Sequence, residues 1–434
     1  MREGVATRQE TAAEPAWPAE PIPVRRRHGH PLLVFARRGG KVVISLVSAI
    51  VLALAWYGWQ YVGDPNEGLT TTQVFDDEGL HAVPLDGAVD ILLVGMDSRT
   101  DAQGNPLPRE VLDTLHAGES DGVRNTDTMI LVHIPQNGQR AVAVSFPRDS
   151  WVELAGGYGK HKLNSAFVYA YNDKFKTLTE RGTADLKEAD RQATISGRKN
   201  LVGTLEKLMG RPGMIDRYAE VNLASFYEIT RALGGIDVCL NNAVKEPKSG
   251  IDLPAGRQTI EGVQALAFVR QRYGLPNVDL DRIVRQQAFL SGLARKVLSR
   301  DVLLNPVKIS DLITAVKKSV VLSDNWDIAE FAAQMRGLNS GNVEFHTIPV
   351  VGPAVIGGAD VLRVDPAAVH DFIGGLTPDT PAESAPPSAP PTSSGRITPA
   401  AKPGSSAGSS SATVASPTTS SQPPITGGEI PCIN

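Results

Sequence analysis

The sequence predicts an α/β protein with a central mixed β-sheet flanked by helices on both faces, which is an αβα sandwich. Two observations lead to this prediction. Uninterrupted apolar runs are typical of strands buried on both faces, and the chain has three of them: Val89–Val94, Met129–Ile134 and Ala141–Phe146. Helical stretches lie between and after these runs, notably Leu201–Met209, Leu223–Leu233 and Ile283–Leu298. Such a mixture of elements favours helices packed on a sheet.

A separate apolar segment precedes this body. Residues 42–62 contain no charge, and 21 helical residues span about 30 Å, the thickness of a hydrocarbon core. Arginines and Lys41 lie on the N-terminal side, so the positive-inside rule places the N-terminus in the cytoplasm and the remainder outside. We expect an uncleaved transmembrane helix. The alternative is a cleaved signal peptide, because Ala53-Leu54-Ala55 resembles a cleavage site.

The remaining boundaries follow from composition. Residues 1–41 are rich in Pro and Arg and predict a disordered cytoplasmic tail, and residues 63–87 predict a linker. The folded body is expected over 88–376. Residues 377–434 contain 12 Pro, 12 Ser and no aromatic residue, so they predict a disordered Pro/Ser/Thr-rich tail.

The charge is unevenly spread along the chain. Of 43 basic and 47 acidic residues, the first 41 positions hold eight and four, and residues 377–434 hold two and three. The segment 42–376 therefore carries a net charge of −7. A body that acidic does not attract nucleic acid through its overall field. Any anion site within it must come from local arginines.

The chain has two cysteines, Cys239 and Cys432, and no CxxC pair or His/Cys cluster with zinc spacing, which disfavours a structural zinc site. Outside the membrane two thiols can oxidise, and the chain regains apolar residues around Cys432. We therefore predict a Cys239–Cys432 disulfide. The alternative is two unrelated free thiols.

Polar clusters occur at the ends of all three apolar runs. Asp97 follows the first run, Asp127 precedes the second, and Arg148 follows the third. Ligands of α/β sheets gather where strand ends meet loops. Two carboxylates and an arginine at such ends can hold a divalent metal and a phosphate.

Arginines recur further along the chain. If residues 268–272 are extended, Arg270 and Arg272 lie on one face. Arg282, Arg285 and Gln286 fall at positions i, i+3 and i+4 of the helix that follows, close to its electropositive N-terminus. Guanidinium groups match phosphate oxygens in a bidentate manner. The alternative is a solvated basic face. No P-loop and no GxSxG nucleophile elbow occurs in the sequence, so phosphate binding depends on these arginines and a metal.

In this order, the segments GMDSR, NTDTM, SFPRD, KHKLNSAF, ALGGIDV, FVRQRYG and LDRIVRQQ resemble the LytR-CpsA-Psr family, with later segments similar to actinobacterial members. The resemblance implies that residues 88–376 form an extracytoplasmic catalytic domain. It also implies that Asp97 and Asp127 are associated with Mg²⁺ or another divalent cation. The implied pyrophosphate-binding set is Arg148, Arg270, Arg272, Arg282 and Gln286, with Arg99 and Arg285 as further members.

Lys162 and Asn164 match a KxN motif beside the site. Each of them either supports the site or has a purely structural role. Many members carry an arginine two residues before the second aspartate, where this chain has Asn125. The neighbouring Arg124 would point elsewhere in an extended segment. Residues 101–123 form a long insertion next to the site, either a lid or an acceptor platform. Residues 221–233 are candidates for a lipid channel, with ordinary core packing as the alternative.

The resemblance implies a phosphotransferase that moves a glycopolymer phosphate from a polyprenyl-pyrophosphate carrier to peptidoglycan. Its partners would be this lipid-linked glycan, the peptidoglycan acceptor and the membrane, with no nucleic acid. Three alternatives stay open: a membrane-bound transcriptional attenuator, a non-catalytic polyprenyl-phosphate binding protein and a plain pyrophosphatase.

Overall fold

The computed structural model describes residues 66–75, 88–118, 124–136, 140–277, 279–303, 305–324, 326–328, 330–331, 338, 340–377 and 424–434. No helix within these ranges is both long enough and apolar enough to cross a membrane. The predicted cytoplasmic tail, 1–41, and the predicted membrane helix, 42–62, lie outside the described residues.

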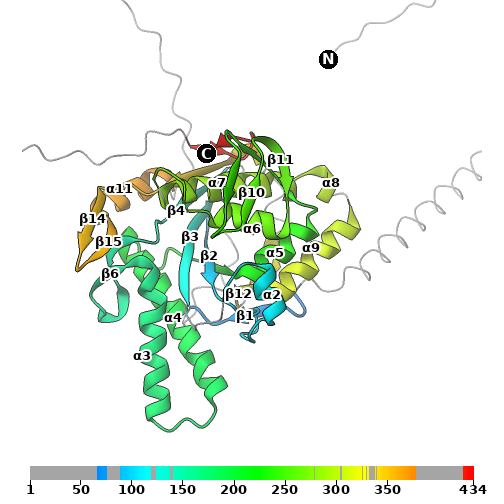
Figure 1. The fold of residues 1–434 in the computed structure, drawn as a ribbon. Coiled ribbons are helices and arrows are strands. Elements are labelled where there is room, and N and C mark those ends of the chain that lie inside the picture. The colour runs from blue at the N-terminus through cyan, green and yellow to red at the C-terminus, as the bar shows by residue number, and fades with distance from the viewer. Residues whose placement is uncertain are drawn as a thin grey trace, which may run out of the picture. The chain divides into compact units, whose positions relative to one another are not determined.

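A mixed sheet runs through the body (Figure 1). Within the described residues it has eight strands in the order β1-β12-β7-β2-β3-β4-β13-β16. These are β1 Thr70–Thr72, β12 Val320–Ser323, β7 Arg217–Val221, β2 Val89–Asp97, β3 Asn125–Ile134, β4 Ala141–Ser145, β13 Val343–Thr347 and β16 Ile425–Thr426. The three apolar runs became β2, β3 and β4, three adjacent antiparallel strands. All five residues of β4 are buried, as a strand covered on both faces requires.

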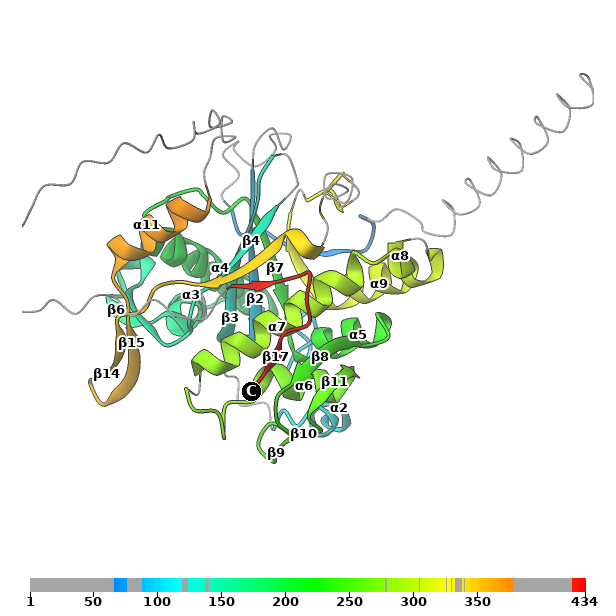
Figure 2. The same ribbon diagram turned by 90° about the horizontal axis from the view of Figure 1, so that it is seen from above.

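Helices cover both faces of this sheet (Figure 2). The helices are α2 Arg109–Thr114, α3 Ala166–Glu180, α4 Leu186–Met209, α5 Leu223–Ala232, α6 Gly262–Arg270, α7 Asp279–Val297, α8 Arg300–Leu303, α9 Pro306–Ser319 and α11 Pro366–Leu376. On one face α3, α4 and α11 pack on Leu92 and Val94 of β2. On the other face, α5, α7 and α9 pack over strand residues whose side chains point the opposite way, such as Ala219 of β7 and Ile130 of β3. The αβα arrangement is therefore confirmed.

Smaller sheets complete the body. One has the order β14-β15-β5-β6 and a second β11-β8-β17, and β9 pairs with β10. Their bounds are β5 Ser150–Glu153, β6 Lys160–Lys162, β14 Gly352–Ile356, β15 Ala359–Arg363, β8 Ile236–Leu240, β11 Gly256–Ile260, β17 Cys432–Ile433, β9 Val244–Glu246 and β10 Ile251–Leu253. Short 3₁₀ turns occupy 155–157, 163–165 and 340–342.

Two of the predicted boundaries are wrong. The expected linker, 63–87, includes β1, which pairs in parallel with β12 at the edge of the main sheet. The expected disordered tail, 377–434, ends in residues 424–434, which add β16 and β17 to two sheets. The predicted disulfide between Cys239 and Cys432 is confirmed, and it joins the paired strands β8 and β17.

Candidate active site

Antiparallel pairing brings the first two polar clusters together. Asp97, the last residue of β2, pairs with Asn125, the first residue of β3, so Asp127 lies two residues along the neighbouring strand. Gly95 permits this close pairing, because a Cβ there would lie 3.0 Å from the Cβ of Thr128. Arg148 follows β4 and reaches Asp127, with 2.5 Å between Nη1 and Oδ1. The three clusters therefore meet at one end of the sheet.

These residues line one end of a cavity of about 510 Å³ on the face covered by α5, α6 and α7. The polar residues that line it include Asp97, Asp127, Arg148, Arg270, Arg272, Arg282, Gln286, Glu246 and Lys248. The rest of the lining is largely apolar, and its residues from β2, β7, α5 and α7 include Leu93, Ala219, Val221, Leu223, Phe226, Ile229, Phe289, Leu290 and Leu293. One cavity thus combines a cationic end with a hydrophobic interior. It is called the lipid cavity below.

The arginines at the cationic end are only partly neutralised. Arg272 Nε and Arg282 Nη1 lie 2.9 and 3.2 Å from the same oxygen, Asp279 Oδ1. The side chain of Arg282 is only 4% exposed, and its buried Nε has no hydrogen-bond partner among the described residues. Burial lowers the pKa of Arg282 despite the attraction of Asp279. A buried guanidinium with a spare donor suits an anionic ligand.

Two acidic residues that sequence reasoning did not assign complete this cluster. Asp149 bonds to Lys162, with Nζ 2.9 Å from Oδ1, and lies 3.6 Å from Arg148 Nε. Burial opposes ionisation of Asp149, but hydrogen bonds with Asp279 and Lys162 and the charge of Arg148 lower its pKa to about 2. Burial and the hydrogen bond with Asp149 raise the pKa of Asp279. The available signal was position: Asp149 follows Arg148 directly, and Asp279 opens the helix that carries Arg282.

Comparison with known proteins identifies the family of this chain. The model of the LytR_cpsA_psr family matches residues 68–374. The chain belongs to the LytR-CpsA-Psr family. The cell wall biosynthesis protein LcpA of Corynebacterium glutamicum is 42% identical over 356 residues, which are 80% of this chain and 66% of that protein. The expected likeness to actinobacterial members is thus confirmed.

More distant relatives lie in other bacteria. A protein of Enterococcus faecalis named polyisoprenyl-teichoic acid–peptidoglycan teichoic acid transferase TagU is 25% identical over 66% of this chain and 79% of its own length. The crystal structure of protein gbs0355 from Streptococcus agalactiae shows the same fold, with a TM-score of 0.51 and 20% identity over 70% of this chain and 93% of that one. Against the two Corynebacterium glutamicum relatives, the chain spans 66% and 54% of their lengths.

The LytR-CpsA-Psr arginines Arg270 and Arg272 both reach the lipid cavity, but not along a strand. The expectation of an extended segment over 268–272 is wrong, because α6 continues to Arg270 and the chain turns out of the helix only at Gln271. Arg270 also contacts the predicted insertion, since its Nη1 donates to the carbonyls of Leu115 and His116 at 3.3 and 3.4 Å.

Arg285 does not join the other arginines. Its Nε donates to the carbonyl of Asn434 at 2.8 Å, and its guanidinium lies 5.3 Å from the ring centre of Phe268. Burial lowers its pKa to about 10. Arg285, predicted to bind pyrophosphate, thus lies outside the lining of the lipid cavity and fastens the C-terminal strand segment to α7. Arg282 and Gln286 of the same helix do face the cavity.

The other family residues support the site from outside the cavity. Arg99 lies 3.6 Å from Asp97 Oδ2, and its Nε donates to the carbonyl of Ala117 at 3.1 Å. Lys162 holds Asp149, and the backbone N–H of Asn164 donates to the carbonyl of Arg148 at 3.0 Å. Arg124 points away from the lipid cavity, as predicted, and binds Asp190 at 2.8 Å.

The acidic residues suit a metal only in combination with a substrate. No group of three or more His, Cys, Asp or Glu side chains in the described part of the chain is placed to hold a metal. Asp97 and Asp127, however, share one cavity with the arginines. Mg²⁺ commonly binds through one or two carboxylates together with substrate phosphates and water. The donor set therefore fits Mg²⁺ bound jointly with a phosphate ligand.

Proposed function

We propose that this protein is a phosphotransferase that moves a glycan phosphate from a polyprenyl-pyrophosphate carrier to peptidoglycan. One observation carries this proposal: the lipid cavity joins an apolar interior to a cluster of partly neutralised arginines. A pyrophosphate-linked lipid has the same two parts, an apolar chain and a polyanion. The printed name of the Enterococcus faecalis relative, a polyisoprenyl-teichoic acid–peptidoglycan transferase, is consistent with it.

In the proposed reaction the lipid chain occupies the apolar interior, where residues 221–229 supply Val221, Leu223, Phe226 and Ile229. Arg148, Arg272 and Arg282 bind the pyrophosphate oxygens. An acceptor hydroxyl attacks the phosphorus that carries the glycan. A new P–O bond forms, the bridging P–O bond breaks, and polyprenyl phosphate leaves with its electron pair.

The proton of the acceptor hydroxyl passes to a carboxylate of the site, either Asp97 or Asp127. The arginines stabilise the charge that develops on the leaving phosphate. Mg²⁺ held by Asp97 and Asp127 would supply further charge neutralisation of the pyrophosphate.

The proposal includes the location of the protein. We place residues 42–62 in the membrane, the N-terminus in the cytoplasm and the catalytic domain outside the cell membrane. The Cys239–Cys432 disulfide supports an oxidising compartment. Tethering to the membrane gives the domain direct access to a lipid carrier.

A reconstituted assay tests the proposal. The full chain in detergent is mixed with a polyprenyl-pyrophosphate-linked oligosaccharide, Mg²⁺ and peptidoglycan, and products are analysed by mass spectrometry. We expect glycan phosphodiester on peptidoglycan and polyprenyl phosphate in equal amounts. Free glycan phosphate alone would indicate a pyrophosphatase, and tight binding without turnover would indicate a binding protein.

Matched variants connect this activity to the site. Arg272→Ala should lower kcat/KM about 10-fold to 150-fold, as expected for losing a contact of about 1.5–3 kcal/mol to a charged group. Arg257 is an exposed residue of β11, and Arg257→Ala should leave kcat/KM unchanged.

A chelator should stop turnover, and added Mg²⁺ should restore it. Asp97→Asn and Asp127→Asn should raise the Mg²⁺ concentration required for turnover. Turnover indifferent to the chelator would remove the metal from the mechanism.

A further inference from the structure

A second cavity, of about 580 Å³, lies on the opposite face of the main sheet from the lipid cavity. The alternation of side chains along two strands places it there. In β7, Ala219 and Val221 line the lipid cavity, whereas Glu220 between them lines the second. In β12, Val320 lines the lipid cavity and Val321 lines the second cavity. This second space, called the polar cavity below, is bounded by β1, the loop after β2, α4 and β7.

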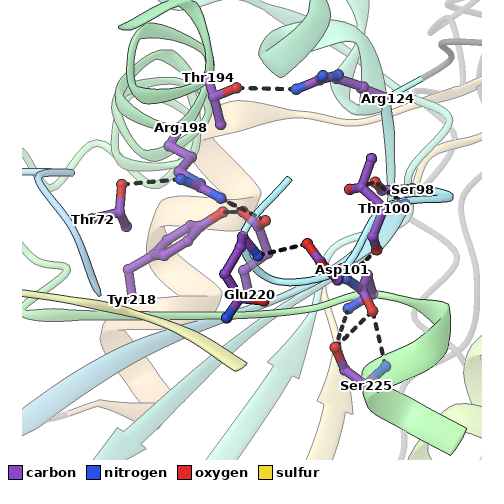
Figure 3. Close-up of polar contacts among 12 residues, drawn as sticks. Thr72, Ser98, Thr100, Asp101, Arg124, Thr194, Arg198, Tyr218, Glu220 and Ser225 are labelled. Carbon is purple, nitrogen blue, oxygen red and sulfur yellow. Dashed lines mark hydrogen bonds and ion pairs between the residues drawn. The ribbon is translucent and has the colours of Figure 1, made fainter. Parts of the chain in front are cut away.

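Its floor is a buried ion pair (Figure 3). Arg198 of α4 donates from Nε and Nη2 to both carboxylate oxygens of Glu220, each at 2.8 Å. The hydroxyl of Tyr218 donates to Glu220 at 2.6 Å, and Arg198 Nη1 donates to Thr72 at 3.0 Å. Burial opposes both charges, but their mutual attraction raises the pKa of Arg198 and lowers that of Glu220. These charges satisfy each other and attract no ion.

The walls are ordered by direct contacts. Arg124 Nη1 donates to Thr194 Oγ1 of α4 at 3.0 Å, a contact visible in Figure 3. At the rim, Asp101 accepts the backbone N–H of Gln103, whose side chain donates to Thr70 of β1 at 2.9 Å. This rim is the start of the insertion predicted from the sequence.

The lining indicates the chemical class of the ligand. Carboxylates outnumber cations: Asp101, Asp185, Glu188, Asp190, Glu220 and Asp324 against Arg124, Lys187, Arg191 and Arg198. A second polyanion is therefore disfavoured. The remaining polar lining consists of hydroxyls and amides: Thr71, Thr72, Gln73, Ser98, Thr100, Gln103, Thr194, Asn222 and Ser319. Such groups exchange hydrogen bonds with a hydroxyl-rich, weakly charged ligand, which is a saccharide.

The two cavities approach each other where the catalytic residues lie. Met96 and Asn222 border both cavities, and Asn222 Nδ2 donates to the carbonyl of Thr100 at 2.7 Å. Asp97 lines the lipid cavity, and the next residue, Ser98, lines the polar cavity. Phosphoryl transfer proceeds with the attacking and leaving oxygens roughly in line. A leaving group held on one face of the sheet therefore calls for an acceptor that approaches from the other.

We propose that the polar cavity binds the saccharide of the peptidoglycan acceptor. The assignment to the acceptor builds on the phosphotransferase proposed above. The donor sugar, attached to the same pyrophosphate, is the other saccharide present, and the experiment separates the two.

The test fills the cavity from two sides. Thr194→Trp adds an indole from α4, and Ala102→Trp adds one from the exposed rim loop. Thr194→Val removes the hydrogen bond from Arg124 without filling the space. Leu186→Trp adds an indole to the start of α4 at an exposed residue outside the lining. Calorimetry measures the Kd of the full chain for a soluble peptidoglycan glycan fragment, for a polyprenyl-pyrophosphate-linked oligosaccharide and for polyprenyl pyrophosphate alone.

We expect either tryptophan in the cavity to weaken binding of the peptidoglycan fragment at least tenfold and to change the Kd for polyprenyl pyrophosphate less than twofold. Leu186→Trp should change neither Kd. Fragment binding that both cavity tryptophans leave intact would overturn the proposal. So would weaker binding of the lipid-linked oligosaccharide with fragment binding unchanged, because the cavity would then hold the donor sugar. These measurements need no turnover, so a wild-type protein that binds the fragment but transfers nothing refutes only the phosphotransferase.

Discussion

The two faces of the sheet use arginine in opposite ways. In the lipid cavity, Arg272 and Arg282 share one oxygen of Asp279, and Arg282 keeps a buried donor without a partner. In the polar cavity, Arg198 donates from Nε and Nη2 to Glu220 and from Nη1 to Thr72. A buried ion pair that is fully bonded is part of the scaffold, whereas excess cationic charge requires a ligand. The Arg198–Glu220 pair therefore belongs to the scaffold, whereas Arg272 and Arg282 retain cationic charge for a ligand.

The largest expected effect is a loss of stability on breaking the Arg198–Glu220 ion pair. Glu220→Gln keeps the shape of the side chain but leaves the buried charge of Arg198 without a counter-charge. We expect the free energy of unfolding to fall by about 3–5 kcal/mol, the usual consequence of breaking a buried pair. Urea denaturation measures it. The double variant Glu220→Gln, Arg198→Met should recover most of the loss, and a single-variant loss below about 1 kcal/mol would contradict the comparison.

The binding arginines should show the reverse pattern. Arg282→Met removes a charge whose burial is already unfavourable, and Asp279 retains Arg272 at 2.9 Å. We expect the free energy of unfolding to change by less than about 1 kcal/mol, because no carboxylate is left alone. Transfer should fall about 10-fold to 150-fold in kcat/KM. Lys296→Met, in the last turn of the same helix, is the matched control. A large loss of stability with activity retained would make Arg282 structural.

The positions of the candidate catalytic residues could be predicted from the sequence better than the backbone that carries the later arginines. Asp97, Asp127 and Arg148 could be placed at one sheet end because their apolar runs are long and unambiguous. The prediction of an extended segment over 268–272 is wrong, because α6 continues to Arg270. Residues 265–269 are buried on every side, so the run has no periodicity to distinguish a helix from a strand.

Other features could not be read from local sequence. The C-terminal strands, 425–426 and 432–433, follow a long Pro- and Ser-rich stretch whose composition dominates the region. Only the apolar residues around Cys432 indicated docking. The polar cavity could not be predicted, because its floor joins Thr72, Arg198 and Glu220 from three distant parts of the chain. No short motif records such an arrangement.

A smaller loss of stability than that of Glu220→Gln is expected at the carboxylates beside the binding arginines. Burial opposes ionisation of Asp149, but hydrogen bonds with Asp279 and Lys162 hold its pKa at about 2, below the usual value of 3.8. A depressed pKa stabilises the fold above the unfolded pKa, and this contribution disappears as pH falls through the folded pKa. Asp149→Asn should therefore cost about 2 kcal/mol at pH 6, with the difference from wild type shrinking between about pH 4 and 2. Asp279 has a raised pKa, so its contribution to stability should instead weaken as pH rises. The variant Asp279→Asn measures this contribution. Urea denaturation across this pH range measures both difference curves in the ligand-free protein. Curves of equal slope would contradict the opposite pKa shifts of the two carboxylates.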